Sequence, residues 1–344
     1  MVHKYYPIRY RYNMEKLDMK YISLLILVIQ NTSLVLLMRY SRTVSGQPYL
    51  TSTAVFLTEI IKIISSVVLL HFEVDCESRK TTEAIHEIFV RYLETLRVAV
   101  PALLYTVQNN LLYIALTKLD AATFQVTYQL KLLTTALCSV LMLNKKVSPL
   151  QWVALCILAV AVALVQLPAD SSLSTMFQSP SLNMDQSIGL LAVVVACLTS
   201  GFSGVYFEKI LKGSKTSLWI RNIQLGLFSM LFSGIGVVVN DWAAVRADGF
   251  FQGYSFIVAI VILLQAVGGL IVAAVIKYAG NILKGFGAAI SIVLSSTVSY
   301  FLLGFQPSPL FLIGSTLVII ATLMYARFVP DPEPPEKSNN STTV

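Results

Sequence analysis

Residues 254–276 read YSFIVAIVILLQAVGGLIVAAVI, a run without a single charged side chain. A helix of about 20 apolar residues covers the hydrocarbon core of a bilayer, so this run predicts a transmembrane helix. Similar runs occur along the whole chain. Together they predict ten membrane-spanning helices, at residues 21–38, 51–72, 98–117, 121–143, 149–167, 187–207, 218–239, 254–276, 282–304 and 309–326.

The composition and the placement of charges also indicate a membrane protein. Hydrophobic residues make up 56% of the 344 residues and charged residues only 12%, whereas soluble domains carry about 25% charged residues. The net charge of +7 would suit nucleic-acid binding, but 18 Lys and Arg residues fall on one side of the predicted membrane and 4 on the other. This bias follows the positive-inside rule and predicts that both chain ends lie in the cytosol. We expect no nucleic-acid partner.

A polar segment without Lys or Arg, residues 168–186, divides the predicted helices into five and five. Because five is odd, a duplicated second half inserts upside down, which gives the inverted repeats typical of transporters. ALTKLDAA at 115–122 precedes SPL at 148–150 much as AVIKYAGN at 274–281 precedes SPL at 308–310. The alternative is chance similarity between helices of like composition.

The predicted fold class is an all-α integral membrane protein with this internal duplication. Its predicted parts are a cytosolic tail at 1–20, a first five-helix repeat at 21–167, a lumenal linker at 168–186, a second five-helix repeat at 187–326 and a second cytosolic tail at 327–344.

Three lysines, Lys62, Lys131 and Lys284, lie within or at the edge of predicted spans. A charge inside a bilayer costs roughly 2.5–3.5 kcal/mol on insertion scales, so we expect each lysine to have a partner or a function. At the helical rise, Lys131 lies about 15 Å along its helix, near the midplane, while Lys284 lies near the cytosolic end. The lysines predict a positively charged path for an anion. The alternatives are a structural ion pair for Lys62 with Glu59 and extension of Lys284 to the membrane surface.

Aromatic and amide side chains accompany the lysines. Phe124, Tyr128 and Lys131 follow i, i+4, i+7 spacing, so they are predicted to share one face of a helix. Other polar side chains in the spans suit sugar hydroxyls and a stacked base: Tyr105, Gln108, Asn109, Gln125, Ser200, Asn222 and Gln265. The alternative is structural, since single amides and hydroxyls in membrane helices often bond a neighbouring helix.

Motifs for catalysis or metal binding do not occur in the sequence. There is no GKS or GKT phosphate loop, no HExxH, no GxSxG and no paired acidic motif. The four cysteines lack CxxC spacing, and the three histidines fall outside or at the edge of the predicted spans. We therefore expect no enzyme activity, no metal ion, no cofactor and no disulfide.

Several longer stretches resemble a known family: VQNNLLYIAL (107–116), LDAATFQVTYQLK (119–131), SGFSGVYFEKILK (200–212), LWIRNIQLG (218–226) and KYAGNILKGF (277–286). They are similar to the nucleotide-sugar transporters of the Golgi, in the branch that carries UDP-N-acetylglucosamine, UDP-galactose and CMP-sialic acid. The resemblance implies a drug/metabolite transporter fold, with ten transmembrane helices in two inverted five-helix repeats. It also implies exchange of a cytosolic nucleotide sugar for a lumenal nucleoside monophosphate, which is UMP for a UDP-sugar.

The resemblance also implies which residues bind the substrate. Tyr105, Gln108 and Asn109 match positions that line the nucleotide pocket, Tyr128 matches a stacking position, and Lys131 and Lys284 match phosphate-side positions. Ser200 and Asn222 match contacts from the second half, and Glu59 with Lys62 matches an acidic–basic pair.

The sugar stays open within this branch. Gly226 stands where sialic-acid carriers have a tyrosine, which favours a UDP-sugar. SLVLLMRYSRT (33–43) and GFFQGY (249–254) resemble UDP-N-acetylglucosamine carriers, whereas ATFQVTYQLK (122–131) is closer to UDP-galactose carriers. The sequence departs from the family's usual KYADN at Gly280, which replaces the aspartate.

The expected ligands are a UDP-sugar and UMP, in a Golgi membrane whose lipid surrounds the helices. A homo-oligomer and glycosyltransferase partners are further alternatives. Two other functions stay open: a drug/metabolite-type exporter of another small solute, and a non-transporting scaffold for glycosyltransferases.

Overall fold

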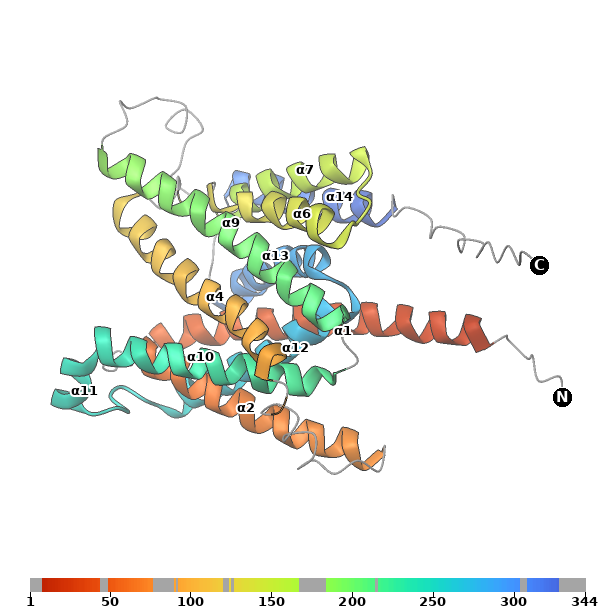
Figure 1. Cartoon of the computed structure of the whole chain (residues 1–344). Helices are drawn as coiled ribbons and strands as arrows, with labels where there is room; N and C mark the ends of the chain where they lie inside the picture. Colours follow the sequence, from red (N-terminus) through yellow and green to blue (C-terminus); the bar gives the residue numbers. More distant parts are fainter. Residues whose placement is uncertain are drawn as a thin grey trace.

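The computed structural model describes residues 8–43, 49–76, 90, 92–119, 124, 127–166, 184–213, 216–303 and 308–327. All regular secondary structure in these residues is helical (Figure 1). The helices are α1 (Ile8–Thr43), α2 (Thr51–Cys76), α4 (Tyr92–Lys118), α6 (Leu130–Leu143), α7 (Pro149–Gln166), α9 (Met184–Gly213), α10 (Leu218–Asn240), α11 (Trp242–Asp248), α12 (Phe256–Tyr278), α13 (Asn281–Leu303) and α14 (Pro309–Arg327).

Seven of the described helices are long and apolar enough to cross a membrane: α1, α2, α9, α10, α12, α13 and α14. Two more, α6 and α7, are apolar but shorter. α4 is 27 residues long, but it contains Glu94, Arg97 and Lys118 and several amides, which lower its hydropathy. The chain is thus a multi-pass helical membrane protein, and the count of ten spans stays a prediction.

Helix boundaries differ from the predicted ones where hydropathy is a poor guide. α1 begins at Ile8, inside the segment predicted as a tail, because a helix can continue in polar sequence beyond the membrane. α6 begins at Leu130, after the start predicted at residue 121, and residues 120–123, 125 and 126 lie outside the described part. α11 is a short additional helix after α10.

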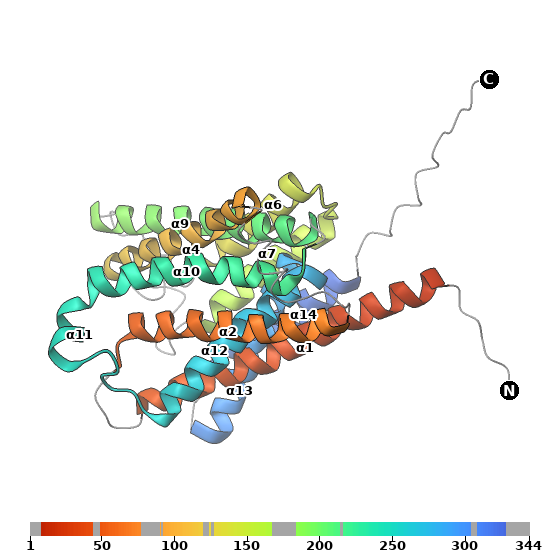
Figure 2. The ribbon, with the colours of Figure 1, turned by 60° about the horizontal axis from the view of Figure 1, so that its bottom comes forward.

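The helices pack in pairs that are distant in sequence. α4 packs on α9, α7 on α14, α2 on α10 and α1 on α12. α9 also contacts α6, and α1 also contacts α13. Figure 2 shows α2 lying between α10 and α12, both of which it contacts. Helices of the first half of the chain are therefore packed against helices of the second half in each of these pairs.

Small residues allow the close approach of α13 to α1. Ser291 and Ser295 are buried, and the Ser291 hydroxyl donates to the Gly287 carbonyl of its own helix at 2.8 Å. A Cβ added at Gly287 would lie 3.1 Å from a methyl group of Leu27 in α1. Gly287, Ser291, Ser295 and Ser299 recur every four residues on α13, and this stripe of small residues includes the face that packs on α1.

Large apolar side chains remain exposed on the same helices, as a membrane protein requires. Leu25, Ile64, Leu191 and Leu323 each expose more than half of their surface. A soluble protein seldom shows so many exposed large apolar side chains, whereas lipid tails solvate them.

Candidate functional site

Lys131, in the first turn of α6, faces two stacked aromatic rings. Its Nζ lies 4.0 Å from the centroid of the Tyr128 ring. The Tyr128 ring stacks on Phe124, with centroids 5.5 Å apart and an interplanar angle of 15°. The predicted proximity of Phe124, Tyr128 and Lys131 is confirmed, although Phe124 and Tyr128 precede the start of α6. A cation over a ring is stabilised by the ring's quadrupole, so part of the cost of burying this charge is offset.

Lys284 lies where α13 crosses α6. A Cβ added at Gly285 would lie 2.8 Å from Leu132 Cδ2, so the residues that follow Lys284 and Lys131 are in contact. This contact places the two lysines on neighbouring turns of α6 and α13, close enough for the Lys131 charge to act on Lys284. Two like charges in one apolar region favour an anion between them.

Two polar residues of α4 border the same region. Gln108 is 7% exposed and donates its Nε2–H to the Tyr128 hydroxyl at 3.3 Å, while its Oε1 has no hydrogen-bond partner among the described residues. Tyr105 faces the hydroxyl of Ser203 in α9. Unsatisfied buried polar atoms are rare in proteins, so Gln108 Oε1 is a candidate ligand contact.

Lys62 and Glu59 form the predicted i, i+3 ion pair on α2, and both are mostly buried. Gly269 of α12 leaves room for the Lys62 side chain, because a Cβ there would lie 2.9 Å from Lys62 Cδ. Gly226 of α10 lies closer to the neighbouring Ile63, since an added Cβ would be 2.7 Å from Ile63 Cγ1 and 3.8 Å from Lys62 Cε. The neighbouring Gly268 leaves space for the side chain of Gln30 in α1, because a Cβ added at Gly268 would lie 2.3 Å from Gln30 Nε2.

The remaining predicted residues differ in how closely they join this region. Ser200 precedes Gly201, where α9 approaches the backbone of Thr134 in α6; a Cβ there would lie 2.8 Å from the Thr134 carbonyl carbon. Asn222 is 1% exposed and donates to the Leu218 carbonyl of its own helix at 3.2 Å. Asn109 lies on α4, but its side chain, like Gln125, is outside the described part.

The contacts described above therefore form two groups. One surrounds Lys131, with contributions from α4, α6, α9 and α13. The other surrounds Lys62, with contributions from α2, α10 and α12. Within the described residues no group of three or more His, Cys, Asp or Glu side chains could hold a metal ion.

A third polar cluster, centred on Glu208, was not predicted. Its side chain has no exposed area, and it pairs with Lys145 and Lys212. Burial lowers the pKa of Lys145, and the neighbouring Glu208 carboxylate counteracts this shift. The sequence signal was an acid at the end of a predicted span, four residues before Lys212.

The architecture and the buried cationic region define a class, a multi-pass helical membrane protein with charged residues inside its bundle. The sequence matches the family described as "Nucleotide-sugar transporter" over residues 15–326. The chain belongs to this family, which indicates a transporter rather than an enzyme.

Several characterised proteins are similar over most of their length. The human UDP-N-acetylglucosamine transporter is 53% identical over 92% of this chain and 97% of its own. The mouse and human UDP-galactose translocators are each 49% identical over 90% of this chain, and over 78% and 77% of their own. A solved crystal structure superposes with a TM-score of 0.61 over 91% of this chain and 99% of its own, at 12% identity, which shows the shared fold alone.

Proposed function

We propose that the protein is an antiporter that imports a UDP-sugar into the Golgi lumen in exchange for UMP. The observation that carries this proposal is the Lys131 region, in which two neighbouring ammonium groups lie beside stacked aromatic rings. Phosphate oxygens suit the lysines, and a uracil ring suits the aromatic face. A UDP-sugar and UMP both carry close to two negative charges, so one set of lysines serves both ligands.

In this proposal Lys131 and Lys284 bind the phosphates, and Tyr128 and Tyr105 flank the base. Gln108 and Asn109 bond the base or ribose. The other proposed contacts are Ser200 on α9, next to the Lys131 group, and Asn222 and the Glu59–Lys62 pair in the Lys62 group.

The pattern of helix packing supports ten spans in two inverted repeats. Let α1, α2, α4, α6 and α7 be the first repeat, and α9, α10, α12, α13 and α14 the second. Exchanging equivalent helices converts the α4–α9 contact into α12–α1, α6–α9 into α13–α1, and α4–α10 into α12–α2, all of which occur. The α2–α10 and α7–α14 contacts convert into themselves. This relation is expected of a two-fold repeat axis.

The proposed location is a Golgi membrane with both chain ends in the cytosol. The start of α1 and the end of α14 lie at the same end of the bundle (Figure 1), as an even number of spans requires. The excess of Lys and Arg on one side supports the cytosolic assignment. The named relatives are UDP-sugar carriers, and those for UDP-N-acetylglucosamine are more similar than those for UDP-galactose, so UDP-N-acetylglucosamine is the first substrate to test.

The test is counterflow in proteoliposomes that contain the purified protein. Vesicles loaded with UMP, or left empty, receive labelled UDP-N-acetylglucosamine, UDP-galactose or CMP-sialic acid outside. We expect UMP to stimulate uptake of UDP-sugars but not of CMP-sialic acid. Uptake without UMP stimulation would indicate an exporter of another kind, and no uptake of any nucleotide sugar would favour the scaffold.

Lys131→Gln provides the matched variant. It keeps the length of the side chain approximately and removes the charge, so we expect UMP-stimulated uptake to be lost while the protein still folds. Uptake at the wild-type rate would show that Lys131 is structural and that the site lies elsewhere.

A further inference from the structure

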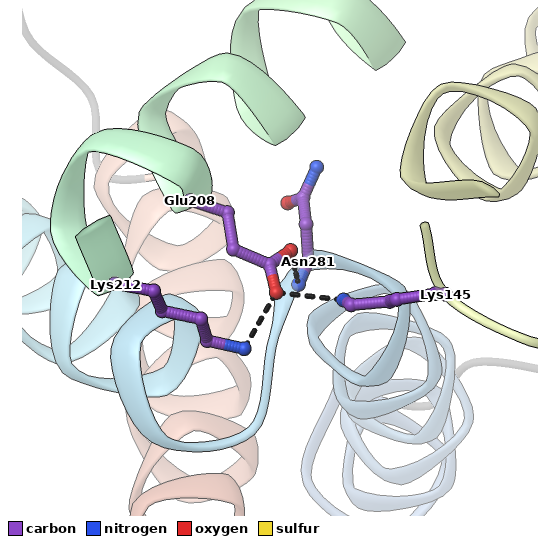
Figure 3. Close-up of polar contacts among 4 residues, drawn as sticks. All are labelled: Lys145, Glu208, Lys212 and Asn281. Carbon is purple, nitrogen blue, oxygen red and sulfur yellow. Dashed lines mark hydrogen bonds and ion pairs between the residues drawn. The ribbon is translucent and has the colours of Figure 1, made fainter. Parts of the chain in front are cut away.

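Glu208 connects three segments of the chain at one end of the bundle. Lys145 Nζ and Lys212 Nζ each lie 2.6 Å from its Oε1, and the backbone N–H of Asn281 donates to its Oε2 at 2.9 Å (Figure 3). Lys145 belongs to the connection between α6 and α7, Lys212 to α9, and Asn281 is the first residue of α13. A fully buried carboxylate is stable only when such donors compensate its charge.

The backbone around the carboxylate has little space for other side chains. Gly280 has φ = +91°, and a Cβ there would lie 2.8 Å from Glu208 Oε1 and 3.0 Å from Lys145 Nζ. A Cβ at Gly204 would lie 2.3 Å from Asn281 Nδ2. The two glycines therefore allow the carboxylate, the lysine and the start of α13 to meet.

Only one of the three donors comes from the first half of the chain. Lys212 and Asn281 belong, like Glu208, to the second half, so they can move with it as one unit. Lys145 belongs to the first half and lies on the side where the charge bias predicts the cytosol. The Lys145–Glu208 pair bridges the α6–α7 connection and the ends of α9 and α13, so separating these segments would require breaking it.

The same carboxylate is linked to the proposed phosphate site. Glu208 accepts a hydrogen bond from the N-terminus of α13, where an anion is stabilised by the helix dipole, and Lys284 lies in the first turn of that helix. Glu208 also attracts Lys284 electrostatically, whereas Lys131 repels it. A phosphate bound between the two lysines would compensate the Lys284 charge that Glu208 attracts, and would add a negative charge near Glu208.

We propose that the Lys145–Glu208 ion pair is a latch that keeps the empty carrier closed on the cytosolic side, and that Glu208 is a positioning residue that makes its opening depend on phosphate at Lys284. The inference rests on the proposed exchange function and deepens it. An empty carrier that stays latched cannot reorient without a nucleotide. This requirement converts a carrier into an obligatory exchanger.

Two lysines on the same oxygen allow a matched test. Lys145→Gln removes the ion pair that joins the two halves at Glu208, and Lys212→Gln removes an equal charge, at an equal distance, from within the second half. Proteoliposomes loaded with labelled UMP are diluted into buffer with or without UDP-N-acetylglucosamine, and UMP efflux is followed. We expect Lys145→Gln to raise efflux into nucleotide-free buffer on the order of tenfold, while Lys212→Gln and Lys145→Arg stay close to wild type.

Glu208→Asp is a second variant. It keeps the negative charge but moves it away from Lys145, so we expect it too to increase UMP efflux into nucleotide-free buffer. Stabilisation of each variant by UMP in a thermal unfolding assay shows that it is folded. If Lys145→Gln and Glu208→Asp leak no more than wild type, or if Lys212→Gln leaks as much as Lys145→Gln, the latch is overturned although the wild-type protein exchanges. A wild-type protein without UMP-stimulated exchange would instead overturn the proposed function itself.

Discussion

The ammonium group of Lys131 lies 4.0 Å from the centroid of the Tyr128 ring, one helical turn before it. The ring offsets part of the cost of removing the lysine from water. Unlike a carboxylate, it does not neutralise the positive charge. Lys62, by comparison, is paired with Glu59. Among the described residues, Lys131 is therefore stabilised by an aromatic ring in a way that leaves its charge able to bind an anion.

The first prediction separates the ring of Tyr128 from its hydroxyl. Tyr128→Phe keeps the ring and loses the bond from Gln108, whereas Tyr128→Leu removes the ring itself. We expect Tyr128→Leu to weaken UMP binding on the order of tenfold, as a loss of about 1–2 kcal/mol predicts, and Tyr128→Phe to weaken it less. Equilibrium binding of UMP to the purified variants measures both. Phe301→Leu, at a side chain that is 76% exposed, is the control, and equal losses in Tyr128→Phe and Tyr128→Leu would contradict the prediction.

Local spacing explains what the sequence predicts about the site. Helical spacing of three, four and seven positions predicts that Phe124, Tyr128 and Lys131 are neighbours and that Glu59 pairs with Lys62, and both contacts occur, although Phe124 and Tyr128 precede α6. The geometry of a single helix fixes such neighbours whatever the tertiary structure. The helix ranges follow similarly from runs of apolar residues, except that α1 and α4 continue into polar sequence.

Contacts between distant segments could not be predicted in this way. Lys145 and Asn281 are 63 and 73 positions away from Glu208, and no periodicity connects them. The room that Gly269 leaves for Lys62 depends on how α12 crosses α2, which one sequence does not encode in any local pattern. The proximity of Lys284 to Lys131 likewise results from the crossing of α13 and α6.

The second prediction concerns two adjacent glycines of α12. Gly269→Ala places a Cβ against Lys62, and Gly268→Ala places one against Gln30. Overpacking should lower the stability of both variants by about 1–3 kcal/mol. Because only Gly269→Ala displaces Lys62, we expect it alone to weaken UMP binding further than the stability loss explains. Thermal unfolding with and without UMP measures the two effects.

Gly236→Ala is the control for this comparison. Gly236 lies inside α10, and no atom lies within 4 Å of an added Cβ. Alanine is a better helix former than glycine by about 1 kcal/mol, so this variant should be at least as stable as wild type. Identical UMP affinities in the Gly268 and Gly269 variants would show that the position of Lys62 does not affect the ligand.

The third prediction concerns Arg221, which is buried in α10 and donates to Glu94 Oε2 of α4 at 2.7 Å. Glu94→Ala leaves the guanidinium group buried without this carboxylate, so we expect a loss of about 3 kcal/mol in the free energy of unfolding. The exposed Lys118–Asp185 pair is the comparison, since Asp185→Ala should cost less than about 1 kcal/mol. Denaturant titration in detergent measures both, and similar losses would mean that the existing bonds from Arg221 to Gln224 Oε1 and Thr216 Oγ1 compensate for the missing carboxylate.

The last prediction concerns Gly280, where the family's usual residue is aspartate. The residue joins α12 to α13 with φ = +91°, a conformation that costs an ordinary side chain roughly 1 kcal/mol but is tolerated by asparagine. A Cβ would also press on Glu208 and Lys145, so Gly280→Ala should unfold at a lower temperature than Gly280→Asn, and both below wild type.

Gly280→Asp adds a second carboxylate beside Lys145, which can then leave Glu208. If the Lys145–Glu208 pair is the latch, Gly280→Asp should increase UMP leak relative to Gly280→Asn, whose side chain has the same shape without the charge. Equal leak in these two variants would show that the charge at this position is irrelevant and that the glycine serves the turn alone.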